Sequence, residues 1–228
     1  MVILREERIG GQRLLLGDCL QVMPMLGRFD AVVTDPPYGI GFASRPTRYQ
    51  RINGMTRKNW DDQPPQDAVL LAVNLATESV VWGGNYFQLR PSRGWLIWQK
   101  FGNAPSMADL ELAWTSLDMN ARAFEKSVKS ASLEKNLQAA AHPSQKPVAL
   151  MEWCLGFLPD ARTILDPFMG SGTTLVACQR LGRNGTGIEV DPEYFDIACR
   201  RVDEAARQPD LLIDAPPAPP AEQKGFDL

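Results

Sequence analysis

Two short stretches, far apart in the chain, contain the residue types that could do chemistry. The first, Asp35-Pro36-Pro37-Tyr38, follows the apolar run 29–34. Its prolines fix the backbone and lack N–H donors, which leaves a rim of acceptors made of the Asp35 carboxylate and neighbouring carbonyls. Tyr38 adds a flat face on which a ring can stack. Such features are typical of a pocket for a base extruded from nucleic acid, although an Asp-Pro-Pro turn after a strand is also common by itself.

The second stretch is a glycine turn, residues 166–174, between a strand-like run and a helix-like run. Gly170 and Gly172 lack a Cβ, so the backbone can lie against a bound molecule beside the N–H groups of a helix start. Glu189 ends the next strand-like run, and its carboxylate can accept both hydroxyls of a ribose. Thr173 stands where a P-loop has its phosphate-binding lysine. A nucleoside without a triphosphate therefore fits better, and a plain strand-to-helix turn is the alternative.

Together the two stretches resemble the S-adenosylmethionine-dependent DNA amino-methyltransferases, which modify adenine N6 or cytosine N4. The tetrapeptide precedes the glycines, as in the β group of that family. Further similar motifs are Leu16–Cys19, Trp82–Phe87, Trp95–Lys100, His142–Pro147 and Gly187–Asp191, so that the resemblance covers about residues 12 to 205. It implies an α/β, Rossmann-like methyltransferase fold, with a mostly parallel twisted sheet of about seven strands flanked by helices.

The resemblance also implies roles for individual residues. The implied catalytic residues are Asp35, Pro36, Pro37 and Tyr38. The implied cofactor contacts are Asp18, Asp166, Phe168, Gly170, Ser171, Gly172, Thr173 and Glu189, with Ser144 and Lys146 at the methionine end. As alternatives, Asp18 is a helix cap, which does not exclude the cofactor role, and Lys146 is an exposed lysine at a proline-started helix. Asn85 and Tyr86 are secondary candidates near the base pocket, where core packing is an equal explanation for Tyr86.

The implied reaction is direct methyl transfer from S-adenosylmethionine to the amine of a flipped base, without a metal or a covalent enzyme intermediate. Asp35 and the Pro36 carbonyl would accept the two amine N–H bonds and favour a pyramidal nitrogen. Adenine N6 in DNA is the expected target, because Asp rather than Ser begins the tetrapeptide. A cytosine-N4 DNA methyltransferase, a catalytically silent DNA-binding module on the same fold and an RNA-modifying enzyme are the alternatives.

Composition agrees with one domain and excludes several other classes. A chain of 228 residues with 44% hydrophobic content can bury one sizeable core. No apolar run reaches about 18 residues and the first residues lack the core of a signal peptide, so we expect a cytoplasmic protein without membrane contact. The cysteines, which form no Cys-x-x-Cys pair and follow no proline, are expected to be free thiols: Cys19, Cys154, Cys178 and Cys199. One histidine makes metal sites and histidine triads hard to build.

The net charge of −3 is unevenly distributed. Residues 208–228 carry four acids against one lysine, which leaves the body neutral. Residues 39–62, directly after the proposed base pocket, are basic and predict a mobile loop that contacts DNA phosphates. The expected DNA contacts are Arg45, Arg48, Arg51, Arg57 and Lys58. A solvated loop without function is the alternative.

Periodicity predicts the elements that must position these residues. Strands are expected at 13–16, 29–34, 80–82, 95–99, 110–115, 163–165 and 185–188, with 121–124 a candidate for the last. Helices are expected at 19–26, 67–79, 148–158, from 175, and at 192–206 with Tyr194, Ile197, Ala198 and Val202 as a core stripe. Four strands end just before or at a polar candidate, Asp18, Asp35, Asp166 or Glu189, so both pockets should lie at the carboxyl ends of the sheet.

The chain is expected to divide into a catalytic domain, residues 1–207, and a Pro-rich disordered tail, residues 208–228. Residues 116–141 would be a short target-recognition segment, which predicts a short recognition site or relaxed specificity. The tail ends in an apolar pair that could dock on a partner such as a sliding clamp, or have no partner. Dimerisation occurs among relatives, but no sequence signal predicts it here, and nothing decides between restriction-modification and phage self-protection.

Overall fold

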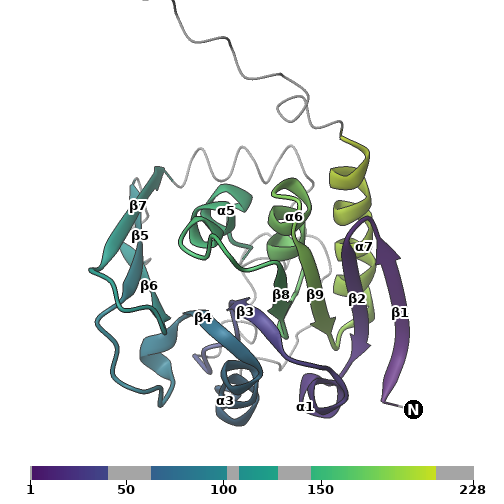
Figure 1. Cartoon of the computed structure of the whole chain (residues 1–228), viewed down its shortest axis with the longest axis horizontal. Helices are drawn as coiled ribbons and strands as arrows, with labels where there is room; N and C mark the ends of the chain where they lie inside the picture. Colours follow the sequence, from purple (N-terminus) through teal and green to yellow (C-terminus); the bar gives the residue numbers. More distant parts are fainter. Residues whose placement is uncertain (1, 41–62, 102–107, 128–144, 209–228) are drawn as a thin grey trace, which may run out of the picture.

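The computed structural model describes residues 2–40, 63–101, 108–127 and 145–208 (Figure 1). The strands are β1 (Ile3–Ile9), β2 (Gln12–Gly17), β3 (Phe29–Thr34), β4 (Ala76–Trp82), β5 (Trp95–Phe101), β6 (Leu110–Thr115), β7 (Arg122–Ser127), β8 (Thr163–Asp166) and β9 (Asn184–Glu189). The helices are α1 (Cys19–Val22), α3 (Gln66–Leu75), α5 (Val148–Gly156), α6 (Thr173–Arg180) and α7 (Pro192–Arg207), with short 3-10 turns η1 (Met23–Met25) and η2 (Gly84–Tyr86).

These strands form one sheet in the order β1-β2-β9-β8-β3-β4-β6-β5-β7. The five strands from β2 to β4 run parallel, and β5 runs parallel to β7. β6 is antiparallel to both of its neighbours, and β1 is antiparallel to β2. The mixed, mostly parallel α/β sheet with flanking helices confirms the expected fold class, and the described chain has nine strands rather than about seven.

Helices cover both faces of the sheet, with α5, α6 and α7 on one face and α1 and α3 on the other (Figure 1). Adjacent strand residues supply the two faces alternately: Leu14 packs under the first group and Leu15 under the second. Val33 and Val32 divide in the same way on β3. Because each fully buried aliphatic side chain of this size contributes about 1.5–3 kcal/mol, these central strands hold their ends in a fixed position.

Three boundaries differ from the sequence-based expectation. The helix expected to reach residue 79 ends at Leu75, because residues 76–79 already pair with β3 in a parallel ladder. The buried stripe of α7 is centred on Phe195 and includes Arg201, whereas Tyr194 and Ile197 are only partly buried. β7 extends to Ser127, so part of the expected target-recognition segment belongs to the sheet.

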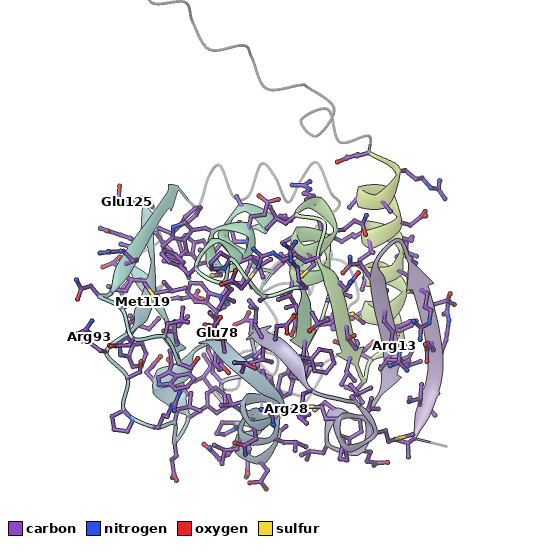
Figure 2. The ribbon with its side chains drawn as sticks, in the orientation of Figure 1. Arg13, Arg28, Glu78, Arg93, Met119 and Glu125 are labelled. Atoms are coloured by element: carbon purple, nitrogen blue, oxygen red, sulfur yellow. The ribbon has the colours of Figure 1, made fainter. Side chains whose placement is uncertain are left out.

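The strand missed by sequence patterning is β1, whose central residues 5–8 are all charged. Such a strand has no apolar alternation to reveal it, but charge suits an edge strand because it discourages pairing with another chain. Arg13 on β2 faces this edge and forms an ion pair with Glu6 at 2.9 Å. Figure 2 shows Arg13 on β2 and Glu125 on β7, near opposite edges of the sheet.

The connections diverge between β3 and β8. From β8 the chain passes through α6 to β9 on one side, and from β3 it passes through α3 to β4 on the other. In open α/β sheets, ligands bind in the crevice that such a divergence leaves at the carboxyl ends of the strands. Asp35 directly follows β3, and Asp166 ends β8. The fold therefore brings the two sequence motifs to neighbouring strand ends at one edge of the sheet.

Several expectations fall outside the described residues. These are the basic residues Arg45, Arg48, Arg51, Arg57 and Lys58, the cofactor candidate Ser144, most of the target-recognition segment and all but the first residue of the tail. Within the described part, no helix is long and apolar enough to cross a membrane. The four cysteines are all described and all free, with Cys154 and Cys178 buried.

Candidate active site

The ends of β3 and β8 are joined by a buried hydrogen bond. The Thr34 hydroxyl donates to Asp166 Oδ1 at 2.7 Å, and the Phe168 backbone N–H donates to the same oxygen at 3.2 Å. Burial raises the pKa of Asp166 to about 6. Tyr38 and Phe168 pack against the same apolar cluster, which is made of Val69, Val81, Phe87 and Trp114. The tetrapeptide and the glycine turn are therefore neighbours in space.

Asp35 is held from two sides at the start of the tetrapeptide. Tyr38 donates its hydroxyl to Asp35 Oδ1 at 2.6 Å, and Lys146 Nζ donates to Oδ2 at 2.6 Å. The Asp35 side chain keeps 20% of its surface exposed. Burial raises the pKa of Asp35 above its ordinary value, and the Lys146 ammonium opposes that shift. Pro36 is buried and Pro37 is partly buried beside it.

The Tyr38 ring rests on the segment that follows β4. It stacks on Tyr86 with ring centroids 5.0 Å apart and an interplanar angle of 12°. Gly83 adopts φ +66°, and a Cβ there would lie 2.1 Å from Tyr38 Cε1. Gly83 is thus needed both for its backbone conformation and for the space that the ring occupies. One face of Tyr38 is covered by Tyr86, so a flipped base would have to use the other.

A chain of alternating charges extends from Asp35 into the protein. Lys146 Nζ lies 3.0 Å from Glu111 Oε2, and the other Glu111 oxygen pairs with Lys100. Burial opposes the charge on Lys146, but Asp35, Tyr38 and Glu111 outweigh it and raise the pKa of Lys146 well above its ordinary value. Burial also opposes the charge on Glu111, yet Lys146 and Lys100 lower the pKa of Glu111 to about 2. Carboxyl and amino groups therefore alternate along this network.

Lys146 was expected to contact a cofactor carboxylate. In the structure its side chain is only 6% exposed, and its ammonium lies between two carboxylates, Asp35 and Glu111. In this structure it therefore contacts the candidate catalytic carboxylate of Asp35. Sequence reasoning missed Glu111 and Lys100, although a single acid inside the alternating strand 110–115 was a signal.

The glycine turn closes on the Glu189 carboxylate. Gly170 N–H donates to Oε2 at 2.8 Å, while the N–H groups of Val190 and Asp191 donate to Oε1 at 2.9 and 2.8 Å. Burial raises the pKa of Glu189 to about 7. Gly170 has φ +52°, and only the Phe168 carbonyl, at 4.0 Å, lies near the place of a missing Cβ. This open side of the turn, next to a carboxylate, fits a nucleoside.

The other residues of the turn hold it against α7. Arg201 Nη1 donates to the Ser171 carbonyl at 2.5 Å, the Ser171 hydroxyl at 2.8 Å and the Thr173 hydroxyl at 3.2 Å. A Cβ on Gly172, at φ +80°, would lie 3.0 Å from Ala198 on the same helix. Arg201 was not singled out from the sequence, although a charged residue on an apolar helix face was the available signal.

Two further contacts connect this turn to its surroundings. The Ser171 hydroxyl donates to Gln145 Oε1 at 3.3 Å. Gln145 therefore contacts the glycine turn, while the next residue, Lys146, contacts Asp35. Asp18 accepts from the Leu20 N–H at 2.9 Å and caps α1, as the capping alternative predicted.

No group of three or more metal-ligating side chains occurs in the described part of the chain.

Residues 97–200 match the model of a family described as DNA methylase, N6_N4_Mtase. The type II methyltransferase M2.LlaDCHI of Lactococcus lactis subsp. cremoris is 28% identical over 171 residues, covering 74% of this chain and 57% of that protein. M2.DpnII of Streptococcus pneumoniae is 29% identical over 170 residues, covering 73% and 56%. The chain thus spans just over half the length of these relatives.

Two solved structures share the fold. The M1.HpyAVI–SAM complex superposes with a TM-score of 0.59 at 22% identity, covering 84% of this chain and 99% of that one. The PvuII DNA methyltransferase, described as cytosine-N4-specific, superposes with a TM-score of 0.58 at 17% identity, covering 87% and 89%. The described chain shares its fold with these two methyltransferase structures, and residues 97–200 are similar to the N6/N4 family of DNA methylases.

Proposed function

We propose that this protein is a DNA methyltransferase that transfers a methyl group from S-adenosylmethionine to the exocyclic N6 amine of adenine. The observation that carries the proposal is the junction of the two loops: the Asp35 carboxylate and the open Gly170 turn lie at the ends of β3 and β8, which Thr34 and Asp166 join. The residues proposed to hold the target base and those proposed to hold the cofactor nucleoside therefore lie at adjacent strand ends.

The residues of the glycine turn fit S-adenosylmethionine. Gly170 leaves room for a ligand at its open side, and Glu189 offers a carboxylate to ribose hydroxyls while three N–H groups fix its orientation. When bound, S-adenosylmethionine supplies an electrophilic methyl group. Asp18 and Phe168 stay candidates for the adenine end, and Ser144 stays a candidate for the methionine end.

The base-side residues act on a poor nucleophile, because the amine lone pair is delocalised into the ring. Asp35 and the Pro36 carbonyl accept its two N–H bonds, which favours a pyramidal nitrogen whose lone pair can attack. The same acceptors would stabilise the positive charge that grows on nitrogen as the methyl group passes from sulfur to nitrogen and S-adenosylhomocysteine is left. Tyr38 would hold the base ring by stacking, and the amine proton leaves to Asp35 or to water.

Adenine is preferred to cytosine because Asp35, rather than a serine, begins the tetrapeptide. The fold alone does not discriminate, since a structure described as cytosine-N4-specific shares it. A catalytically silent DNA-binding module is disfavoured because Asp35, Tyr38 and Glu189 are all present in an ordered arrangement. The basic residues of 39–62 are proposed to contact DNA phosphates, and the names of the relatives support a restriction-modification setting.

The test is methylation of bacterial DNA that carries no modified bases. Purified protein is incubated with this DNA and tritium-labelled S-adenosylmethionine. The DNA is then digested to nucleosides, which are identified by mass spectrometry. N6-methyldeoxyadenosine is the expected product, and N4-methyldeoxycytidine would replace the adenine assignment. Binding of S-adenosylmethionine without any incorporation into DNA or RNA would favour the silent module.

A further inference from the structure

The resting arrangement of Asp35 conflicts with the reaction proposed for it. Asp35 Oδ1 accepts from Tyr38 and Oδ2 accepts from Lys146, so the incoming amine must share the carboxylate with both donors. Lys146 is also a cation, placed beside the nitrogen on which positive charge would develop. Two positive charges so close repel one another in a partly buried site, so Lys146 in this position opposes the transition state.

Glu111 offers a second position for the same ammonium. Its Oε1 is paired with Lys100, which fixes the side chain. Its Oε2 is buried and has no hydrogen-bond partner among the described residues, although Lys146 Nζ lies only 3.0 Å away. The distance already suits a hydrogen bond and only the direction is unfavourable. A shift of Lys146 Nζ toward Glu111 would complete this bond and lengthen the contact with Asp35.

We propose that Lys146 is a two-position residue, which holds Asp35 Oδ2 in the empty site and turns to Glu111 Oε2 when the target amine arrives. Glu111 is then the positioning residue that clears the catalytic carboxylate. This inference rests on the proposed methyltransferase function and adds to it two residues with defined roles.

The charges of the network are suited to this exchange. The Lys146 ammonium donates to Asp35 Oδ2 and to the Tyr38 hydroxyl at 3.2 Å, which leaves the third of its N–H donors for Glu111. With Lys146 on Asp35, the carboxylate stays ionised and oriented in the absence of a base. With Lys146 on Glu111, the negative charge of Asp35 faces the nitrogen of the target amine, on which positive charge develops. The movement of Lys146 does not change the total charge of the site, so this movement needs no proton transfer.

A double-mutant cycle tests this dependence. Glu111→Gln keeps the shape of the side chain but removes the charge that attracts the ammonium, and Lys146→Met removes the ammonium but keeps the aliphatic stem. Steady-state kcat/KM for unmodified bacterial DNA is measured for the wild type, both single variants and the double variant. Asp160→Asn, which removes a carboxylate from an exposed turn before β8, is the matched control. Thermal unfolding and S-adenosylmethionine affinity verify that each variant is folded.

The expected result is strong non-additivity. Glu111→Gln lowers kcat/KM about 10-fold or more in the wild type, because Lys146 stays on Asp35, but has less than about a 2-fold effect when Lys146 is already Met. Lys146→Arg, which keeps a cation, keeps the sensitivity to Glu111→Gln. Equal losses in both backgrounds would overturn the two-position role and leave Glu111 a structural residue. A wild type that methylates DNA, combined with an additive cycle, refutes this inference alone, whereas an inactive wild type refutes the proposed function and the inference with it.

Discussion

The Thr34 hydroxyl donates a buried hydrogen bond of 2.7 Å to Asp166, 132 residues further along the chain. Thr34 is the last residue of β3 and Asp166 the last of β8, so this bond fixes the spacing between the base loop and the cofactor turn. Both side chains are almost fully buried, which makes the bond costly to lose.

Replacing Thr34 by valine should therefore destabilise the protein. The shape is kept, but the buried Asp166 oxygen loses a donor, and the free energy of unfolding should fall by about 1–3 kcal/mol. Urea unfolding followed by circular dichroism measures the change. Thr34→Ser, which restores the hydroxyl, should recover much of it, and an unchanged unfolding midpoint for Thr34→Val would show that the bond contributes nothing.

Substitution of Gly83 by alanine should displace Tyr38 and reduce turnover. The new Cβ would lie 2.1 Å from the ring, and misplacing a catalytic group by about 1 Å can cost about 100-fold in rate. Gly182→Ala is the matched control, because Gly182 also has a positive φ, +63°, but nothing lies within 4 Å of its missing Cβ. Equal methylation rates for the two variants would show that the close fit at Gly83 is irrelevant.

Arg201 should matter for cofactor affinity although it lies behind the turn. Arg201→Met removes three hydrogen bonds to Ser171 and Thr173, and affinity for S-adenosylmethionine should fall about 10-fold as the turn loosens. Isothermal titration calorimetry gives the dissociation constant. Arg200→Met, an exposed neighbour on the same helix, should leave it unchanged. Similar constants for both variants would contradict the anchoring role.

Cofactor binding should depend on pH through Glu189. Burial raises the pKa of this carboxylate to about 7, so it is partly protonated at neutral pH in the free protein. A ribose hydroxyl donates best to the ionised form, and affinity should rise with pH up to about pH 7 and then level off, by up to about tenfold per pH unit below that value. Glu189→Gln should bind weakly and without this slope, and an equal slope in the variant would assign the titration to another group.

Ionisation of Glu189 has the opposite effect on folding stability from its effect on cofactor affinity. Because the pKa of Glu189 is higher in the folded protein than in the unfolded chain, the folded state binds more protons between about pH 4.5 and about pH 7. Its contribution therefore lowers stability as pH rises through that window, and Asp166, whose pKa is raised to about 6, acts in the same direction. In Glu189→Gln the fall in unfolding free energy across this window should be smaller.

The sequence predicted those elements of the fold and those site residues that depend on local patterns. Asp35 and Asp166 could be placed at the ends of neighbouring strands because each follows a short apolar run and strand ends of a parallel sheet share one edge. Glu111 could not be placed, because its role depends on the insertion of β6 between β4 and β5, which sets it opposite Trp98 and beneath Lys146. Long-range pairing of this kind leaves only a weak local signal.

Two other differences have similar causes. The boundary between α3 and β4 was misplaced because the helical periodicity continues past Leu75, while pairing with β3 decides the structure of residues 76–79. The role of Arg201 depends on the angle at which α7 packs on the glycine turn, which moves the buried stripe from Tyr194 to Phe195. In both cases tertiary contacts override a pattern that was correctly recognised.

Methyl transfer by the wild type and by Asp35→Ala, measured side by side as tritium incorporation from S-adenosylmethionine into unmodified DNA, tests the central claim most directly. The account predicts incorporation by the wild type, a loss of at least about 100-fold in the variant, and nearly equal S-adenosylmethionine affinity in the two proteins. Near-wild-type incorporation by Asp35→Ala would contradict it.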